Sequence, residues 1–382
     1  MAETSRKREI AVEAHGSFAT VRELYARGVG LEDAPFLSPA WLGALEDTGC
    51  VVADRGWVPH HLVIKDGAEP IAVAPAYLKL NSEGEFVFDH GWANAAHRAG
   101  IDYYPKLLVA VPFTPATSQR IVSMPGADPA LARPAFVAAL EAIVERAELS
   151  SAHVLFSRAE EAESLAALGM IHRHGVQFHW QNRGYDTFEA FLADLPSKRR
   201  TQIRREMRAP KEQGIEIETL AGEQLTPEIA DVAYELYLTT VDKFIWGRRY
   251  LTRAFFEEVM RSMRDAVELV VAREEGSPKI FACAFNLRGE HALFGRYWGA
   301  FREVPFLHFN VCYYHSIERA IALGLDRFEP GAGGEHKLSR GFLPTVTHST
   351  HLVRDARLGV AVRDFCARER RAIAREVSSE TR

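Results

Sequence analysis

The order of strand-like and helix-like segments most constrains the fold, because it is similar in the two halves of the chain. In the first half, four stretches of strand length come first: His61–Ile64, Ile71–Leu80, Glu85–Asp89 and Leu107–Val111. A long helix (Asp128–Leu149), a strand (His153–Phe156) and a short helix (Glu160–Leu168) are expected to follow. This order indicates an α+β fold, in which helices pack on a mixed sheet.

The second half repeats the order after a basic segment. Thr226 and Pro227 are typical of a helix start, and this helix is expected to run to about Val241. Three strands, a helix and a last strand are expected to follow: Val267–Arg273, Ile280–Leu287, His291–Trp298, Phe309–Leu323 and Leu325–Pro330. No literal repeat accompanies the similar order. We therefore predict two domains related by duplication, residues 1–185 and 186–382.

Length and composition agree with this prediction. The 382 residues exceed the range of about 100 to 200 residues that one domain usually has. Hydrophobic residues make up 47% of the chain and charged residues 25%, which is ordinary for a globular protein and excludes a disordered or fibrous one.

The amino-terminal residues are basic but lack a following apolar region, so no secretory signal is expected. No window approaches the roughly 18 consecutive apolar residues of a membrane-spanning helix. The four cysteines are scattered, and the histidine pairs His60-His61 and His172/His174 have no carboxylate or cysteine at ligand spacing. We therefore expect a cytoplasmic protein without integral membrane association, a metal site or a tightly bound cofactor.

Charge is distributed unevenly along the chain. The net charge is -5, which excludes a global field attractive to nucleic acid and predicts no binding to DNA. Residues 196–214 (PSKRRTQIRREMRAPKEQG), however, carry seven Lys or Arg against two Glu, a net of +5. Arg200, Arg204 and Arg208 recur at helical spacing before Pro210 and could contact successive phosphates. The alternative is a solvated helix with Ile203 and Met207 packed inward.

Two segments of the second half concentrate candidate functional residues. Residues 331–341 (GAGGEHKLSRG) place Glu335, His336, Lys337 and Arg340 beside glycines that let a backbone approach a ligand closely. So many ionisable side chains beside glycines suit the binding of an anionic group or a carbonyl group. A solvated surface loop is the alternative interpretation. In the segment FGRYWG, alternation predicts Phe294, Arg296 and Trp298 on one strand face, and Gly295 and Gly299 exposing the backbone to a ligand. An aromatic strand in the core is the alternative.

These segments resemble the characteristic blocks of a known family. GRYWG, FLHFNVCYYHSIERAIALGL and FEPGAGGEHKLSRG are similar to motifs of a bacterial family of predicted N-acyltransferases in the GNAT superfamily, related to the Fem peptidoglycan aminoacyltransferases. EFVFDHGWANAA, YYPKL and PFTP in the first half resemble the same family. The resemblance covers about residues 15 to 355 and implies two GNAT-like domains in tandem.

The resemblance also implies where an acyl donor binds. In GNAT enzymes the backbone of a splayed central strand holds the donor carbonyl, and that strand is Leu293–Gly299 here. The loop that cradles the coenzyme A pyrophosphate corresponds to residues 300–309 (AFREVPFLHF), which contain no glycine. Because PSKRRTQIRRE resembles the start of the second domain in Fem-type proteins, aminoacyl-tRNA is the favoured donor, and acyl-CoA the alternative. Arg200, Arg204, Arg208, Arg296, Trp298 and Arg340 are the predicted donor-binding residues.

This chain departs from the family pattern at three positions. The family often has an acidic residue at the position of Asn310 and a glutamine at each of the positions of His315 and Gly333. Candidate bases are His308, Glu335 and His336, and Lys337 is the predicted stabiliser of the oxyanion. The predicted acceptor-binding residues, expected at a domain interface, are Asp89, Trp92, Tyr103, Tyr104 and Lys106.

The sequence thus predicts an acyltransferase that forms an amide with an amine of a small molecule or peptide. A non-catalytic module that uses the same fold to bind a ligand is the competing hypothesis.

Overall fold

The computed structural model describes residues 9–243 and 249–380. The chain divides into two structural units. Unit 1 comprises the described residues within Met1–Glu46, Val51–Gly175 and Val346–Glu376, and unit 2 those within Asp47–Cys50, Val176–Thr345 and Val377–Arg382. The predicted division at residue 185 assigned all later residues to the second domain. The structure instead packs residues 346–376 with unit 1, so the chain changes unit within strand β9 and again within strand β15.

Unit 1 is built on two sheets. Its strands are β1 (Ile10–His15), β2 (Trp57–Pro59), β3 (His61–Asp66), β4 (Glu69–Ala74), β5 (Ala76–Lys79), β6 (Lys106–Val109), β7 (Val122–Ser123) and β8 (Ser151–Ser157). The order in the smaller sheet is β1-β3-β4-β7, and the larger sheet runs β15-β8-β6-β5-β2 within this unit. Strands β3 and β4 form a hairpin, in which they pair antiparallel around Gly67, whose φ is 62°.

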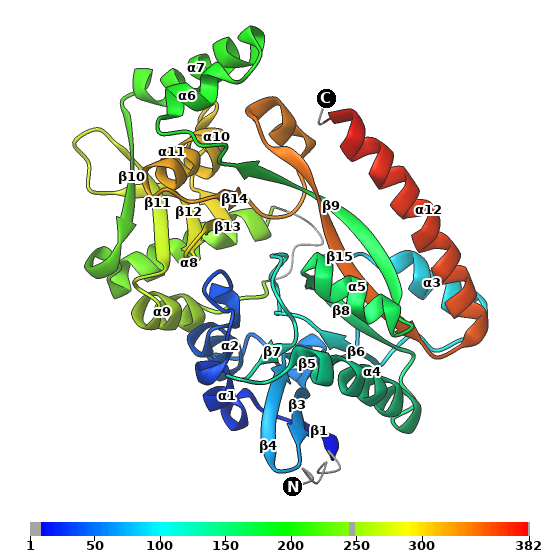
Figure 1. Ribbon diagram of the computed structural model, residues 1–382. Coiled ribbons are helices and arrows are strands. Elements are labelled where there is room, and N and C mark those ends of the chain that lie inside the picture. The colour runs from blue at the N-terminus through cyan, green and yellow to red at the C-terminus, as the bar shows by residue number, and fades with distance from the viewer. Residues whose placement is uncertain (1–8, 244–248, 381–382) are drawn as a thin grey trace, which may run out of the picture. The chain divides into compact units, whose positions relative to one another are not determined.

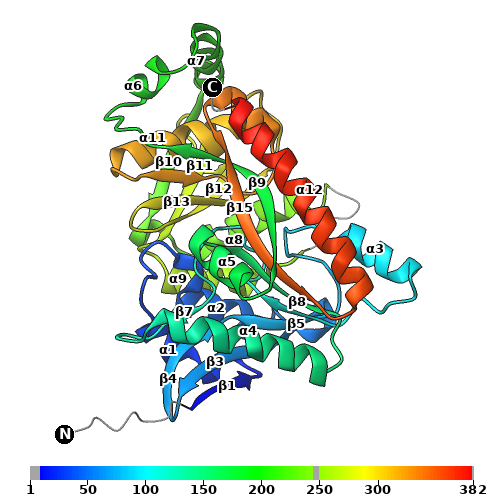
Figure 2. The same ribbon diagram turned by 45° about the vertical axis from the view of Figure 1, so that its right-hand side comes forward.

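Helices complete unit 1, as both views show (Figures 1 and 2). They are η1 (Phe18–Thr20), α1 (Arg22–Arg27), η2 (Pro35–Leu37), α2 (Pro39–Asp47), η3 (Ala53–Arg55), α3 (His90–Arg98), α4 (Pro129–Arg146), α5 (Ala159–Ala167) and most of α12 (Ala356–Glu380). Asp128 caps α4, and Phe136 and Leu140 of this helix join the core formed with β3, β6 and β8. A second apolar cluster joins α3 to α12 through Trp92, Ala96 and Val362.

Unit 2 has one sheet in the order β10-β11-β12-β13-β14-β9. Its strands are the carboxyl-terminal part of β9 (Ile171–Gln181), β10 (Ile215–Ala221), β11 (Val267–Glu274), β12 (Ile280–Arg288), β13 (Ala292–Ala300), β14 (Arg327–Glu329) and the start of β15 (Leu343–Val353). Its helices are α6 (Phe188–Ala193), α7 (Ser197–Glu212), η4 (Gly222–Gln224), α8 (Pro227–Val241), α9 (Arg253–Ser262), α10 (Leu307–Phe309), η5 (Asn310–Tyr314), α11 (His315–Ala322) and η6 (Glu335–Arg340). Figure 1 shows α8 and α9 on one side of β11–β13, with α10 and α11 on the other.

The same strand–helix–strand arrangement occurs in both units. In unit 1, β5 and β6 pair antiparallel, and the chain returns through α4 so that β8 pairs parallel with β6. In unit 2, β12 and β13 pair antiparallel, and the chain returns through α10, η5 and α11 so that β14 pairs parallel with β13. The predicted α+β fold of two similarly built halves, with mixed sheets and flanking helices, is confirmed.

Three local predictions are wrong. Residues 85–89 form no strand, and α3 follows them. The stretch Ile71–Leu80 forms two strands, β4 and β5, which belong to different sheets, instead of one strand. Pro210 does not end the basic helix, because α7 continues to Glu212. Among the described helices, none combines the length and the apolar character needed to cross a lipid bilayer.

Candidate functional site

A cavity of about 310 Å³ in unit 2, which we call the β13 pocket, brings five of the predicted site residues together. They are Arg296, Trp298, His308, His336 and Lys337. The remaining lining residues are Thr240, Ala284, Asn286, Gly295, Tyr297, Cys312, Tyr313, Pro330, Ala332, Gly333 and Gly334. A larger hollow of about 770 Å³, lined mainly by α8 and α9, includes none of the predicted residues.

The pocket lies where β13 and β14 separate. The two strands pair only over Ala292–Phe294 and Arg327–Glu329, whereas β13 continues to Ala300. At the point of separation, a Cβ on Gly295 would lie 3.2 Å from the Cα atom of Pro330. Glycine therefore lets the two backbones approach closely before they diverge, and β13 presents backbone groups to the pocket beyond this point.

A β-bulge in β13 changes the predicted alternation. Phe285 pairs with Tyr297 but Asn286 pairs with Gly295, so Arg296 is the extra residue. As a result, Leu293 and Trp298, which unbroken alternation would place on opposite faces, both pack toward the helices that follow β13. The prediction that Phe294, Arg296 and Trp298 share a face is therefore wrong.

Gly299 serves packing rather than ligand access. A Cβ at this position would lie 1.7 Å from the carbonyl oxygen of Leu236, so glycine allows α8 to contact the strand. The Ala300 N–H donates to Thr239 Oγ1 of the same helix over 3.1 Å. Of the two glycines in GRYWG, only Gly295 lines the pocket.

The π-helical turn η5 and the preceding helix α10 place three side chains at the pocket: His308, Cys312 and Tyr313. Such wide turns often occur at functional sites. The His308 ring contacts the ring of Trp298, with 5.3 Å between centroids. Burial, and then the charges of His336, Lys337 and Arg340, lower the pKa of His308 to about 4. His308 is therefore neutral at pH 7.

The glycine-rich segment forms another wall. Gly331, Gly333 and Gly334 all have positive φ, and the turn they form lets Lys337 reach inward. Lys337 is 2% exposed, its Nζ donates to the Gly331 carbonyl over 2.7 Å, and burial lowers its pKa to about 8. At pH 7 the pocket therefore contains a buried cation.

His336 is exposed, and its Nε2 lies 2.9 Å from the hydroxyl oxygen of Tyr313. Partial burial and the charges of Arg340 and Lys337 lower its pKa. The side chain of Glu335, the other predicted base in this segment, lies outside the described part of the structure.

Arg340 forms a buried ion pair instead of lining the pocket. Its Nε and Nη2 donate to the two carboxylate oxygens of Glu206 over 3.1 and 2.9 Å, and Tyr314 donates to the same carboxylate. Its Nη1 donates to the His336 carbonyl over 2.8 Å. Arg340 thus holds η6 against α7, and sequence reasoning missed the role of Glu206 because an acid within a basic segment looks like a solvated charge.

Asn310 completes this contact between helices. Pro210 has no N–H, so the carbonyl of Glu206, four residues earlier, lacks its usual helical donor. The Asn310 side chain donates to that carbonyl over 2.8 Å. The amide therefore satisfies a main-chain group that proline leaves open, which explains why α7 tolerates Pro210.

None of the three predicted arginines of α7 is among the residues that line the β13 pocket. Arg200 donates to the carbonyls of Ala193 and Leu195, at the end of α6. Arg204 forms an exposed ion pair with Glu189 over 2.6 Å, and Arg208 is exposed. Ile203 is buried, as the amphipathic alternative predicts.

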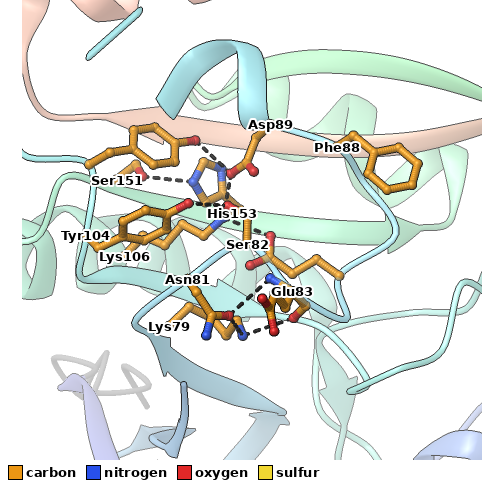
Figure 3. Close-up of polar contacts among 12 residues, drawn as sticks. Lys79, Asn81, Ser82, Glu83, Phe88, Asp89, Tyr104, Lys106, Ser151 and His153 are labelled. Atoms are coloured by element: carbon orange, nitrogen blue, oxygen red, sulfur yellow. Dashed lines mark hydrogen bonds and ion pairs between the residues drawn. The ribbon is translucent and has the colours of Figure 1, made fainter. Parts of the chain in front are cut away.

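Four of the five predicted acceptor residues form one hydrogen-bonded cluster in unit 1 (Figure 3). The Lys106 ammonium, 0% exposed, donates to Asp89 Oδ2, to Glu85 Oε2 over 2.8 Å and to Ser82 Oγ over 3.0 Å. Tyr103 donates to Asp89 Oδ2 over 2.7 Å, and the Tyr104 hydroxyl lies 2.8 Å from Ser82 Oγ. Asp89 precedes α3 but does not cap it, because its carboxylate is used here.

Burial and charge determine the protonation of this cluster. Burial opposes ionisation of Asp89, but the adjacent Lys106 outweighs it and holds the pKa of Asp89 well below its usual range. Burial, and then the Asp89 charge, raise the pKa of Glu85 to about 7. Glu85 Oε1 and Asp89 Oδ1 are buried oxygens without a hydrogen-bond partner among the described residues, which leaves two acceptor positions for a donor.

Trp92 lies beside two buried histidines that the sequence did not single out. Its ring meets that of His351 edge-on at 4.9 Å, and Arg173 lies over it at 4.8 Å. His153 Nδ1 and His351 Nδ1 are 2.7 Å apart. Burial and then Lys106 lower the pKa of His153 to about 3, so this pair is neutral. Every residue of β8 is buried, so no alternation in the sequence marked His153 as part of this cluster.

Comparison with known proteins identifies a matching family. Residues 17–382 match the model of the FemAB-like family, described as peptidoglycan biosynthesis/recognition. No curated protein sequence is significantly similar to the chain.

Among solved structures, the fold is similar to that of FemX, with a TM-score of 0.51 and 12% identity over 93% of this chain and 100% of that one. It is also similar to the C-terminal domain of a putative lysylphosphatidylglycerol synthetase from Agrobacterium fabrum, with a TM-score of 0.51 and 13% identity over 91% of this chain and 96% of that one. A conserved protein of unknown function from Bacteroides thetaiotaomicron VPI-5482 has a TM-score of 0.51 and 12% identity over 90% and 100% of the two chains. At such identities the similarity concerns the fold.

The family match over nearly the whole chain confirms the resemblance that the motifs indicated and supports the assignment to the acyltransferases. This chain belongs to the FemAB-like family.

Proposed function

We propose that the chain transfers an acyl group from an activated donor to an amine and that the reaction occurs in the β13 pocket. The observation that carries this proposal is the separation of β13 from β14 beside the buried Lys337. As a result, one cavity of about 310 Å³ contains backbone of β13 beyond its pairing with β14, the buried ammonium of Lys337 and two neutral histidines, His308 and His336.

Each group suits one requirement of amide formation. Backbone N–H groups of β13 beyond Gly295 hold the donor carbonyl, and Lys337 stabilises the negative oxygen of the tetrahedral intermediate. The attacking amine must lose a proton, which neutral His336 at the rim accepts. His308 is a weaker base, because its pKa of about 4 lies further below pH 7.

Aminoacyl-tRNA is the donor that we favour. The segment before α10 has no glycine to cradle a pyrophosphate, and α7 has exposed basic side chains, including Arg204 and Arg208. Phosphates of a tRNA would bind there by charge. Acyl-CoA is the alternative donor, because its phosphates could bind the same side chains. The family description favours a peptide amine as the acceptor.

The acceptor-binding role of Asp89, Trp92, Tyr103, Tyr104 and Lys106 is also a proposal. Glu85 Oε1 and Asp89 Oδ1, which have no hydrogen-bond partner in the described part of the chain, support it because they can accept hydrogen bonds from an ammonium group. Substitution Asp89→Asn is expected to raise KM for the amine more than it lowers kcat.

The test offers purified protein a panel of aminoacyl-tRNAs and acyl-CoAs together with amines and peptides, and detects mass-shifted amides. Ribonuclease treatment before the assay should abolish activity if tRNA is the donor and leave it unchanged if acyl-CoA is. If no donor across the panel is consumed while a ligand still binds, the protein is a binding module and the proposal fails.

A further inference from the structure

Three histidines of unit 1, none of which belongs to the β13 pocket or to the hydrogen-bonded cluster around Lys106, come together on two neighbouring strands. His172 and His174 lie on β9, and His348 lies on β15, which is next to β9 in the sheet. One ligand nitrogen from each of the three lies within 4.8 Å of the others. His172 Nε2 and His348 Nδ1 are 3.0 Å apart.

The arrangement follows from strand geometry. Residues two apart on a strand point to the same face, so His172 and His174 project together. Their ring centroids are 4.7 Å apart, and that of His348 lies 5.2 and 5.0 Å from theirs. The sequence predicted no metal site because this third histidine is 174 positions beyond His174 and only the fold brings it close.

We infer that His172, His174 and His348 bind one divalent transition-metal ion of the zinc class. Three imidazoles and an open fourth position are a known zinc arrangement, in which neighbouring ligand nitrogens of a tetrahedral site are about 3.3 Å apart. The 3.0 Å pair already has nearly this spacing. The third nitrogen lies within 4.8 Å of both, so its ring must move closer to bind the same ion. Imidazole ligands select zinc, copper or nickel over magnesium or calcium.

The surroundings admit a cation. All three side chains are half-buried, so an ion can enter while the fourth position stays open to water. The exposed carboxylate of Glu163 on α5 interacts favourably with His348, and Glu369 of α12 with His174. Arg370 opposes a cation near His172 and His174, although its long side chain can turn toward solvent.

The test uses the full chain without a polyhistidine tag, first freed of metal by a chelator. Titration with zinc chloride, followed by calorimetry and by metal analysis after gel filtration, is expected to give one zinc ion per chain. Cobalt(II) added to the wild-type protein should give the intense visible absorption of a tetrahedral site, and this measurement needs no substitution.

Variants locate the site. His174→Ala and His348→Ala should each weaken zinc binding by more than about 100-fold, since the loss of even an outer-shell partner costs roughly 10- to 100-fold. His97→Ala removes an exposed histidine of α3 and should bind zinc like the wild type. Zinc should raise the Tm of the wild type and of His97→Ala but not that of His174→Ala.

Absence of stoichiometric zinc binding to the wild type, or only an octahedral cobalt spectrum, would overturn the inference. So would unchanged zinc affinity in both His174→Ala and His348→Ala. Either result would mean that the three histidines only contact one another, with a hydrogen bond between His172 and His348.

Discussion

At the scale of single residues, burial determines what the ionisable groups of the β13 pocket can do. Lys337 has lost most of its contact with water, and its pKa falls from 10.5 to about 8. The unfolded chain therefore holds this proton more tightly than the folded chain between about pH 8 and 10.5. Keeping Lys337 charged thus destabilises the fold below pH 8, and this cost is relieved as pH rises through that window.

Replacement of this lysine should consequently stabilise the protein while it impairs function. Lys337→Met is expected to raise the free energy of unfolding at pH 7 by roughly 1–2 kcal/mol, after allowance for the lost hydrogen bond to Gly331. The difference from the wild type should shrink as pH rises to 10. Urea denaturation of both proteins at pH 7, 8.5 and 10 measures it, and a pH-independent difference would contradict the assigned pKa.

At the scale of secondary-structure elements, the pocket depends on how α7, α8 and η6 are fixed. Arg340 and Glu206 join η6 to α7 through a buried pair, with side-chain exposures of 6% and 2%. Gly299 lets α8 approach β13 closely. The first contact positions η6 and the second positions α8. A substitution that disrupts either contact should therefore displace backbone in the wall of the β13 pocket.

The buried pair and an exposed pair on the same helix should differ sharply. Arg340→Leu leaves the Glu206 carboxylate buried without its cation and is expected to destabilise the protein by about 3–5 kcal/mol. Arg204→Leu breaks the exposed pair with Glu189 and should cost under about 1 kcal/mol. Chemical denaturation of both variants tests this, and equal effects would show that the Arg340 pair contributes no more than a surface contact.

The two glycines give a second matched comparison. Gly299→Ala would place a Cβ 1.7 Å from the Leu236 carbonyl oxygen, so α8 must move, and a loss of more than about 2 kcal/mol is expected. Gly91 is in α3, where an added Cβ would have no other atom within 4 Å, so Gly91→Ala should stabilise by up to about 1 kcal/mol. Thermal unfolding of both variants measures the difference, and an unchanged Tm in Gly299→Ala would refute the close approach.

At the scale of the whole molecule, duplication of one strand–helix–strand arrangement was predictable because periodicity is a local property. The pattern of apolar residues predicted most strands of unit 2 and the start of α8 at Thr226. The family motifs added the candidate site residues Lys337, His336 and His308. The β-bulge at Arg296 and the π-helical turn η5 were not predictable, since each adds a residue to an element without a sequence signal. Nor was the placement of residues 346–376 in unit 1, which depends on contacts distant in sequence.

The most direct test of acyl transfer in the β13 pocket compares the steady-state kinetics of two lysine variants with those of the wild type. Lys337 is buried in the pocket, whereas Lys279 is exposed and does not line it. With a donor and amine that the wild type converts, Lys337→Met should lower kcat/KM by at least about 100-fold, the usual cost of losing an oxyanion stabiliser. Lys279→Met should stay within about twofold of the wild type. Equal activity of Lys337→Met and the wild type would contradict the assignment of the reaction to this pocket.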